Sequence, residues 1–213
     1  FTDANCGFDA DPAITGDVKD EADNCTTSLD ATFSDMIAAG SCEGERIITR
    51  TWRLTDDCGN TTTKTQIITV EDNTAPTFTA PANTTIFTDA NCGFDADPSV
   101  TGDVTDEADN CTTSLEATFS DVVTDGSCEG ERIITRTWSL VDDCGNEAAA
   151  QVQLITVEDN TAPTFTAPAN TTIFTDANCG YDADPSVTGD VTDEADNCTT
   201  SLEATFSDVI TDG

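Results

Sequence analysis

The sequence contains no histidine, one methionine and one tyrosine, and only seven of its 213 residues are lysine or arginine. Without histidine, the chain lacks the usual base of serine and cysteine hydrolases and a common ligand of zinc. Nucleic acid and anionic lipid both require lysine and arginine for binding, so the composition excludes both as partners. The 42 acidic residues bring the formal charge to −35, which favours the binding of metal cations.

Long apolar runs and phosphate-binding glycine loops are also missing. No stretch approaches the roughly 18 to 20 apolar residues that span a bilayer, so we expect no membrane insertion in this segment. Paired carboxylates catalyse glycoside hydrolysis in other proteins. Here the acidic residues are spread over turns and recur in every copy of a repeat. We therefore predict that the chain is not an enzyme.

A repeated unit dominates the sequence. The phrase FTDANCG begins at Phe1 and Phe87, and the near copy FTDANCGY begins at Phe174, so the period is 86 to 87 residues. A fixed period of this size is typical of linear arrays of small domains that contact mainly their neighbours. We predict three repeats and expect them to belong to a longer array: 1–72, without its first strand, 73–159, which is complete, and 160–213, without its C-terminal strands.

Alternating hydrophobic residues predict strands within each repeat. The segment Arg132–Val141 places Ile134, Trp138 and Leu140 on one face, and small polar residues on the other. Arg136 shares the apolar face, so we expect it near a rim or paired with an acidic residue. Trp138 and its counterpart in the first repeat, Trp52, are interpreted as core residues because each lies inside an alternating strand.

Other strands and the repeat boundaries follow from turn residues. Val152–Val157 is a second strand, and the proline-containing stretches Glu71–Pro76 and Glu158–Pro163 mark boundaries. The remaining predicted strands are an edge strand and two short ones: Thr77–Thr88, Ser99–Thr105 and Ser114–Ser120. About seven short strands per repeat are typical of an antiparallel sandwich. We therefore predict an all-β chain of tandem immunoglobulin-like antiparallel β-sandwiches.

Three phrases carry a resemblance to a known class of module. DNTAPTFTAPANTTI, DEADNC and RTWSLVDDCGN are similar to the hyalin-repeat and immunoglobulin-like modules of very large bacterial surface proteins, including gliding-motility adhesins of Bacteroidetes-type bacteria. The resemblance covers the whole chain. It implies a linear array on the cell surface or in a secreted filament.

Ten cysteines in regular positions, without CxxC motifs or histidine, favour disulfides in an oxidising, extracellular compartment over zinc. In an immunoglobulin-like order, the first and third cysteines of a repeat lie at one end of the sandwich, and the second and fourth lie at the other. We therefore predict four bonds: Cys6–Cys42, Cys25–Cys58, Cys92–Cys128 and Cys111–Cys144. This scheme leaves the partners of Cys179 and Cys198 beyond Gly213. Sequential pairing is the alternative, and it would join Cys179 to Cys198.

Aspartate and asparagine in the turns predict a calcium site, because calcium takes six to eight hard oxygen ligands. The linker Glu158–Phe165 is similar to the linker that binds calcium between cadherin repeats. We expect the segments Asp106–Asn110 and Asp142–Asp143 to meet the linker Glu71–Asn73 and to enclose an ion. The candidate ligands are Asp72, Asn73, Asp106, Asp109, Asn110, Asp142, Asp143, Asp159 and Asn160. The alternative is an acidic surface that is solvated without an ion.

These features together predict a structural role. We expect a stalk or filament segment of an extracellular bacterial repeat adhesin, which provides reach and rigidity for attachment or motility. Its main partners are then neighbouring repeats of the same chain or filament. One alternative is a module that binds surface glycans or proteins with avidity from repetition. Another is the subunit of a self-assembling fibre that is completed by strand exchange.

Overall fold

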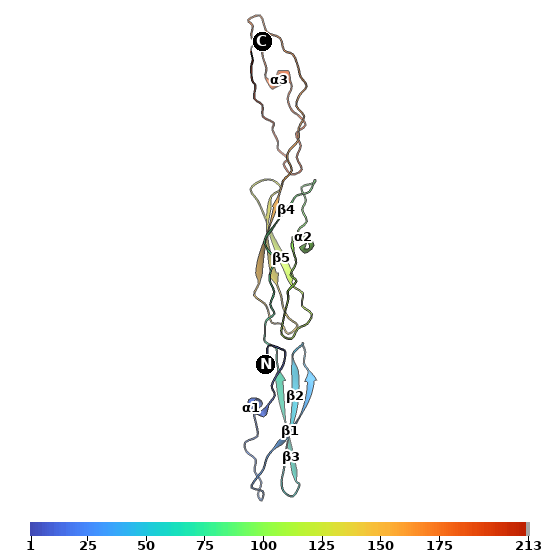
Figure 1. Ribbon diagram of the computed structural model, residues 1–213, viewed down its shortest axis with the longest axis vertical. Coiled ribbons are helices and arrows are strands. Elements are labelled where there is room, and N and C mark those ends of the chain that lie inside the picture. The colour runs from blue at the N-terminus through green and yellow to red at the C-terminus, as the bar shows by residue number, and fades with distance from the viewer. Residues whose placement is uncertain (212–213) are drawn as a thin grey trace. The chain divides into compact units, whose positions relative to one another are not determined.

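The computed structural model describes residues 1–211 and is mostly β (Figure 1). Its strands are β1 Thr32–Ala39, β2 Arg46–Thr55, β3 Thr61–Val70, β4 Thr84–Phe87, β5 Thr118–Asp125, β6 Arg132–Ser139 and β7 Gln151–Glu158. The described part of the chain also contains three helices of one turn each: α1 Pro12–Thr15, α2 Pro98–Thr101 and α3 Pro185–Thr188. Within residues 1–211, no helix has the length and apolar character needed to cross a membrane.

The strands form two sheets. In the first, β2 lies between β1 and β3 and pairs with both in the antiparallel direction, as Figure 1 shows. The second has the order β4-β7-β6-β5, and β4 pairs with β7 in the parallel direction. The expectation of purely antiparallel sheets is therefore wrong at β4. A hairpin would force an antiparallel pair, but a long stretch of chain separates β4 from β7, so either direction is open to them.

Residue contacts divide the chain into two compact units that combine distant segments. Unit 1 contains Phe1–Pro81, Asp103–Ser120 and Thr137–Val152. Unit 2 contains Ala82–Gly102, Asp121–Arg136 and the described residues from Gln153 onward. These units do not follow the sequence repeats, because unit 1 joins the first repeat to part of the second. The division of the chain into domains 1–72, 73–159 and 160–213 stays a prediction.

Two of the predicted strands are confirmed. Arg132–Val141 contains β6, and Val152–Val157 lies within β7. Trp138 is completely buried and Trp52 is 8% exposed, so the interpretation of both as core residues is also confirmed. The core of unit 1 is a cluster of Phe78, Val104, Trp138 and Leu140. The core of unit 2 is a cluster of Ile86, Ile134, Ile155 and Val157.

Arg136 is paired with an acidic residue, as expected, but it is buried and does not lie at a rim. Its Nε and Nη2 atoms donate to the two carboxylate oxygens of Asp121 at 2.8 Å. Nη1 donates to the hydroxyl of Thr101 at 2.9 Å, and Nη2 also donates to the carbonyl oxygen of Ala96 at 2.6 Å. The guanidinium therefore has partners on several sides, which is what a buried charge requires.

The first repeat has the same arrangement around Arg50, whose partners are Asp35, Thr15 and the carbonyl oxygen of Ala10. The hydrogen bonds from Arg50 lower the pKa of Asp35. The same ion pair raises the pKa of Arg50. In both repeats, the arginine on the apolar face of the strand is therefore a buried core residue that is paired with an aspartate.

The predicted strand Ser99–Thr105 is wrong, because α2 occupies its first residues. Asp97 accepts a hydrogen bond from the backbone N–H of Ser99 at 2.9 Å, and Pro98 begins the helix. An aspartate N-cap followed by proline at the first helical position is a strong start signal for a helix. The predicted strand Ser114–Ser120 is shifted, since β5 begins only at Thr118. Residues 160–211 contain α3 and an isolated bridge, and no strand.

Candidate functional site

Three disulfide bonds connect cysteines across 102 to 106 residues of sequence. Unit 1 contains Cys6–Cys111 and Cys42–Cys144, and unit 2 contains Cys92–Cys198. Each bond joins one sequence repeat to the next. The first cysteine of a repeat bonds to the second cysteine of the following repeat. In unit 1, the third cysteine of the first repeat also bonds to the fourth cysteine of the second repeat.

The disulfide pairs predicted within repeats are therefore wrong, and so is sequential pairing. The predicted pairs were Cys6–Cys42, Cys25–Cys58, Cys92–Cys128 and Cys111–Cys144. Cys6 and Cys42 do line the same cavity of about 480 Å³, but Cys111 of the next repeat also lines it. The prediction considered one repeat alone, so it did not include the cysteines of the neighbouring repeat, which are the actual partners. Within residues 1–211, four cysteines are free and exposed: Cys25, Cys58, Cys128 and Cys179.

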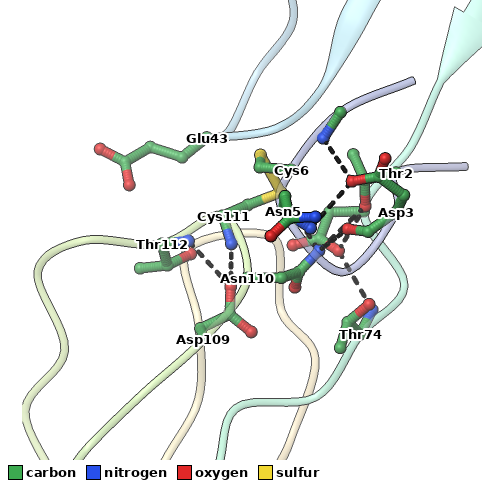
Figure 2. The surroundings of a disulfide bond; sticks show 12 residues. Thr2, Asp3, Asn5, Cys6, Glu43, Thr74, Asp109, Asn110, Cys111 and Thr112 are labelled. Atoms are coloured by element: carbon green, nitrogen blue, oxygen red, sulfur yellow. Dashed lines mark hydrogen bonds between the residues drawn. A yellow bond between two sulfur atoms is a disulfide. The ribbon is translucent and has the colours of Figure 1, made fainter. Parts of the chain in front are cut away.

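A tight turn presents Cys111 to its partner (Figure 2). The Oδ2 atom of Asp109 accepts hydrogen bonds from the backbone N–H groups of Cys111 and Thr112, both at 2.8 Å. The side-chain amide of Asn110 donates to the carbonyl oxygen of Asp3 at 2.9 Å. Aspartate and asparagine favour such turns because their short side chains can bond to nearby backbone groups. The turn thus fixes both the cysteine and the segment that carries Cys6.

Gly44 allows the close approach of this disulfide. Its φ angle is +86°, and a Cβ atom built on it would lie 2.6 Å from the sulfur of Cys111. The equivalent Gly130 in unit 2 also has φ +86°, and its Cβ would lie 2.5 Å from the sulfur of Cys198. Glycine is the residue that combines a left-handed backbone with no side chain. Both positions therefore depend on glycine for two separate reasons.

Glu43 and Asp143 add hydrogen bonds beside the two disulfides of unit 1. The backbone N–H of Glu43 donates to Oδ2 of Asp143 at 2.8 Å, and the hydroxyl of Thr112 donates to Oδ1 at 2.7 Å. These donors lower the pKa of Asp143, the Glu43 N–H having the larger effect. The Glu43 carboxylate in turn accepts from the backbone N–H of Thr113 at 2.7 Å. In unit 2, Glu129 accepts from Thr200 in the same way at 2.9 Å.

Three of the predicted calcium ligands come together in unit 1. Asp72, Asp109 and Asp142 each offer one carboxylate oxygen, and these oxygens lie within 4.8 Å of one another. Asp72 is 8% exposed and Asp142 is 6% exposed, so two of the three carboxylates are removed from solvent. Asn110 lies beside Asp72, because both bond to the hydroxyl of Thr2, at 3.3 and 3.0 Å. We call Asp72, Asp109, Asn110 and Asp142 the acidic cluster.

The other predicted ligands have different surroundings. Asp106 accepts from Thr79, whose hydroxyl and backbone N–H lower the pKa of Asp106. Asp143 is engaged by Glu43 and Thr112, as described above. Asp159 accepts from Thr88 and from the backbone N–H of Thr161 in unit 2. Asn73 and Asn160 are exposed. The acidic cluster therefore contains four of the nine predicted residues.

Sequence reasoning missed the residues that support the site: Thr2, Glu43, Gly44 and Thr113. A signal for two of them was present, because the phrase SCEGE occurs at both Ser41 and Ser127. In both copies the order is Cys-Glu-Gly-Glu, and a glycine at such a position indicates a turn at which another chain segment approaches closely.

A comparison with models of known protein families and a comparison with curated protein sequences both return no match. The resemblance to hyalin-repeat and adhesin modules therefore stays a prediction. The functional features of this site are the disulfide cross-links, the turns capped by carboxylates and the acidic cluster.

Proposed function

We propose that the chain is a tension-resisting segment of an extracellular stalk or filament, of the kind formed by tandem repeats of bacterial surface adhesins. The observation that carries this proposal is the connection of successive sequence repeats by disulfide bonds. Most small extracellular domains use disulfides to close loops within one domain. A bond from one repeat to the next contributes instead to the strength of the array, because force along the chain is transmitted through the cross-links.

The cross-links shorten the covalent path through the chain. From Phe1, the shortest path reaches Cys6, crosses to Cys111, returns along the backbone to Cys92 and crosses to Cys198. It contains roughly 40 residues, which span at most about 140 Å at 3.6 Å per residue. The 213 residues of the reduced chain would extend to about 760 Å. A stalk that must hold its length under load benefits directly from this difference.

The composition and the cysteines support an extracellular location. Three disulfides require an oxidising environment, which cells maintain mainly outside the cytosol. The formal net charge of −35 also opposes association with anionic surfaces. In a longer array, the same pairing order would give Cys25 and Cys58 partners in a preceding repeat, and Cys128 and Cys179 partners in a following one.

Single-molecule stretching tests the proposal. The oxidised chain, pulled from its two ends, should stop extending near 140 Å, and reduction should release it to about 760 Å. Replacing Cys92 and Cys198 by serine should lengthen the oxidised limit to about 390 Å. The matched control replaces Cys42 and Cys144, which lie off the shortest path, and should leave the limit unchanged. Equal extension before and after reduction would contradict the proposal.

A further inference from the structure

The acidic cluster contains acceptor oxygens that have no donor. Oδ1 of Asp72 accepts from Thr2 and Thr74, at 3.0 and 3.1 Å, whereas its Oδ2 is buried without a hydrogen-bond partner among the described residues. Oδ1 of Asp109 and Oδ1 of Asn110 are likewise buried without partners. A buried polar atom that has lost water and gained no partner costs about 1–3 kcal/mol, and more when it is charged. Three such atoms in one cluster indicate that something else satisfies them.

Each of these side chains is fixed by its other polar atom. The second oxygen of Asp109 caps the turn at Cys111, and the amide nitrogen of Asn110 donates to the carbonyl oxygen of Asp3. Both oxygens of Asp142 accept from Asn146, at 2.7 and 2.8 Å. The ion pairs among residues 1–211 use Asp35, Asp121 and Asp125, so no basic side chain neutralises the cluster. Three carboxylates at this distance repel one another unless a cation lies between them.

The same arrangement recurs in unit 2. Thr88 donates to Asp159 at 3.2 Å, as Thr2 does to Asp72, and the amide of Asn197 donates to the carbonyl oxygen of Asp89 at 3.0 Å. Asp196 caps the turn at Cys198 as Asp109 does at Cys111. Oδ2 of Asp196 and Oδ1 of Asn197 are again buried and without partners. The orphaned oxygens of the aspartate and asparagine in this turn therefore recur at equivalent residues in both units.

We propose that unit 1 binds one calcium ion through the four side chains of the acidic cluster: Asp72, Asp109, Asn110 and Asp142. All four offer hard oxygen atoms, which calcium prefers and soft metals do not. Calcium binds oxygen at about 2.3–2.6 Å, so two ligands of one ion lie at most about 5 Å apart. The spacing within 4.8 Å among the three aspartates meets this limit. Magnesium binds at about 2.0–2.1 Å and keeps more of its water, so it fits this set less well.

The ion would hold the linker against the turns that carry the disulfides. Asp72 belongs to the linker that follows β3, Asp109 precedes Cys111, and Asp142 lies two residues before Cys144. Binding therefore adds a second, reversible connection to the place where two disulfides already join successive repeats. This site goes beyond the proposed mechanical role, because it makes the stiffness of the linker depend on extracellular calcium.

Calorimetric titration of the oxidised full chain, stripped with a chelator and held in about 0.15 M salt, tests the site directly. Screening at this ionic strength suppresses diffuse attraction between the acidic surface and free ions. We expect saturable calcium binding in the range of about 10⁻⁴–10⁻³ M that is typical of extracellular modules. Magnesium should bind more weakly. Calcium uptake that never saturates, or tighter binding of magnesium, would overturn the proposal.

Two equivalent aspartates provide a matched pair of variants. Asp23 occupies the position of Asp109 in the first repeat and caps the turn at Cys25 in the same way, but it is exposed and lies outside the acidic cluster. Asp109→Asn should weaken calcium binding at least ~10-fold, because affinity follows the number of charged ligands. Asp23→Asn should leave it unchanged. Equal effects of the two substitutions would show that the cluster is not the site.

The change in melting temperature caused by a substitution separates a metal ligand from a purely structural residue, because for a ligand its sign differs between chelator and calcium. In the chelator, Asp72→Asn should melt at or above the temperature of the unaltered chain, because it removes one of three repelling charges. In calcium, the same variant should melt below it, because a ligand has been lost. Destabilisation by the same amount in both conditions would assign Asp72 a structural role and would refute the inference. If Asp72→Asn fails to fold, Asp109→Asn and Asp23→Asn decide the question through the same two melting curves.

Discussion

The buried arginine of the first two repeats gives the most demanding test of how this fold is stabilised. Arg136 is 1% exposed, and its guanidinium makes hydrogen bonds to Asp121, Thr101 and the carbonyl oxygen of Ala96. Substituting methionine keeps an unbranched side chain of similar length but removes every one of these donors. Asp121 then retains its charge without a counterion, and the Thr101 hydroxyl, which is also buried, loses its arginine partner.

The expected cost follows from which groups are left behind. Removing one partner of a buried ion pair typically destabilises a protein by about 3–5 kcal/mol. The side chain of Asp121 is 24% exposed, so water can solvate part of the abandoned carboxylate. We therefore expect Arg136→Met to lower the free energy of unfolding by about 3 kcal/mol. For a chain of 150 to 250 residues, this corresponds to a fall in melting temperature of about 6–12 °C.

Urea unfolding of the oxidised chain, followed by far-ultraviolet circular dichroism, measures this cost. Arg136→Lys should recover only part of it, because an ammonium group cannot reproduce the paired bonds to both oxygens of Asp121. The double variant Arg136→Met/Asp121→Leu should be more stable than Arg136→Met alone, since no unpaired charge remains. The reasoning is refuted if Arg136→Met costs less than about 1 kcal/mol, or if the double variant is the less stable of the two.

Two further predictions concern unit 1. Gly44→Ala should destabilise the chain by about 1–3 kcal/mol more than Gly59→Ala in urea unfolding. Both glycines have a positive φ angle, but a Cβ at Gly59 meets nothing within 4 Å, whereas one at Gly44 meets Cys111. The Glu43 N–H and the Thr112 hydroxyl lower the pKa of Asp143. The ionised Asp143 carboxylate therefore stabilises the fold fully above its ordinary pKa near 4, and this stabilisation is lost as the pH falls through the lowered pKa. The difference in urea midpoint between the unaltered chain and Asp143→Asn should therefore be constant from pH 5 to 7 and shrink below about pH 4, and a difference that grows there would contradict the assignment.

The parts of the fold that depend on local pattern were predictable. Alternation identified β6 and placed Ile134, Trp138 and Leu140 on one face, and all three are buried. The turn residues after Val157 marked the end of the segment that forms β7. The alternation also indicated that Arg136 lies near a rim or pairs with an acidic residue, and pairing is what the structure shows. The alternation could not show which one, since Asp121 lies on β5, fifteen residues away, and the pairing register selects it.

The helices α1 to α3 were missed although their signal was local. The phrase Asp-Pro at each start provides an N-cap and a preset φ angle, and Thr15, Thr101 and Thr188 follow in the same register. β-branched residues in these segments favoured a strand interpretation instead. In the first two repeats, this threonine donates its hydroxyl back to the backbone and accepts from the buried arginine. The helix is therefore retained by a tertiary contact that no propensity scale contains.

The disulfide pairing could not be obtained from one repeat at a time. Cysteines at equivalent positions have nearly identical neighbours, so the local sequence gives Cys25 and Cys111 the same turn and the same capping aspartate. Cys111 is nevertheless buried in a disulfide, whereas Cys25 is free and exposed. The difference arises from a second copy of the unit, which supplies Cys6, and not from the turn itself.

The same argument explains why the acidic cluster was only half predictable. The turns at Asp23 and Asp109 are equal in sequence and in hydrogen bonding, yet the Asp72 carboxylate meets only the second of them. A repeat therefore encodes a turn whose free carboxylate oxygen stays solvated until the linker of a preceding repeat covers it. The disulfide and the proposed cation site are then completed together, because Asn110 and Cys111 are consecutive residues that contact the segment of Thr2, Asp3 and Cys6. The disulfide and the acidic cluster therefore form only where two successive repeats meet, because each needs residues from both.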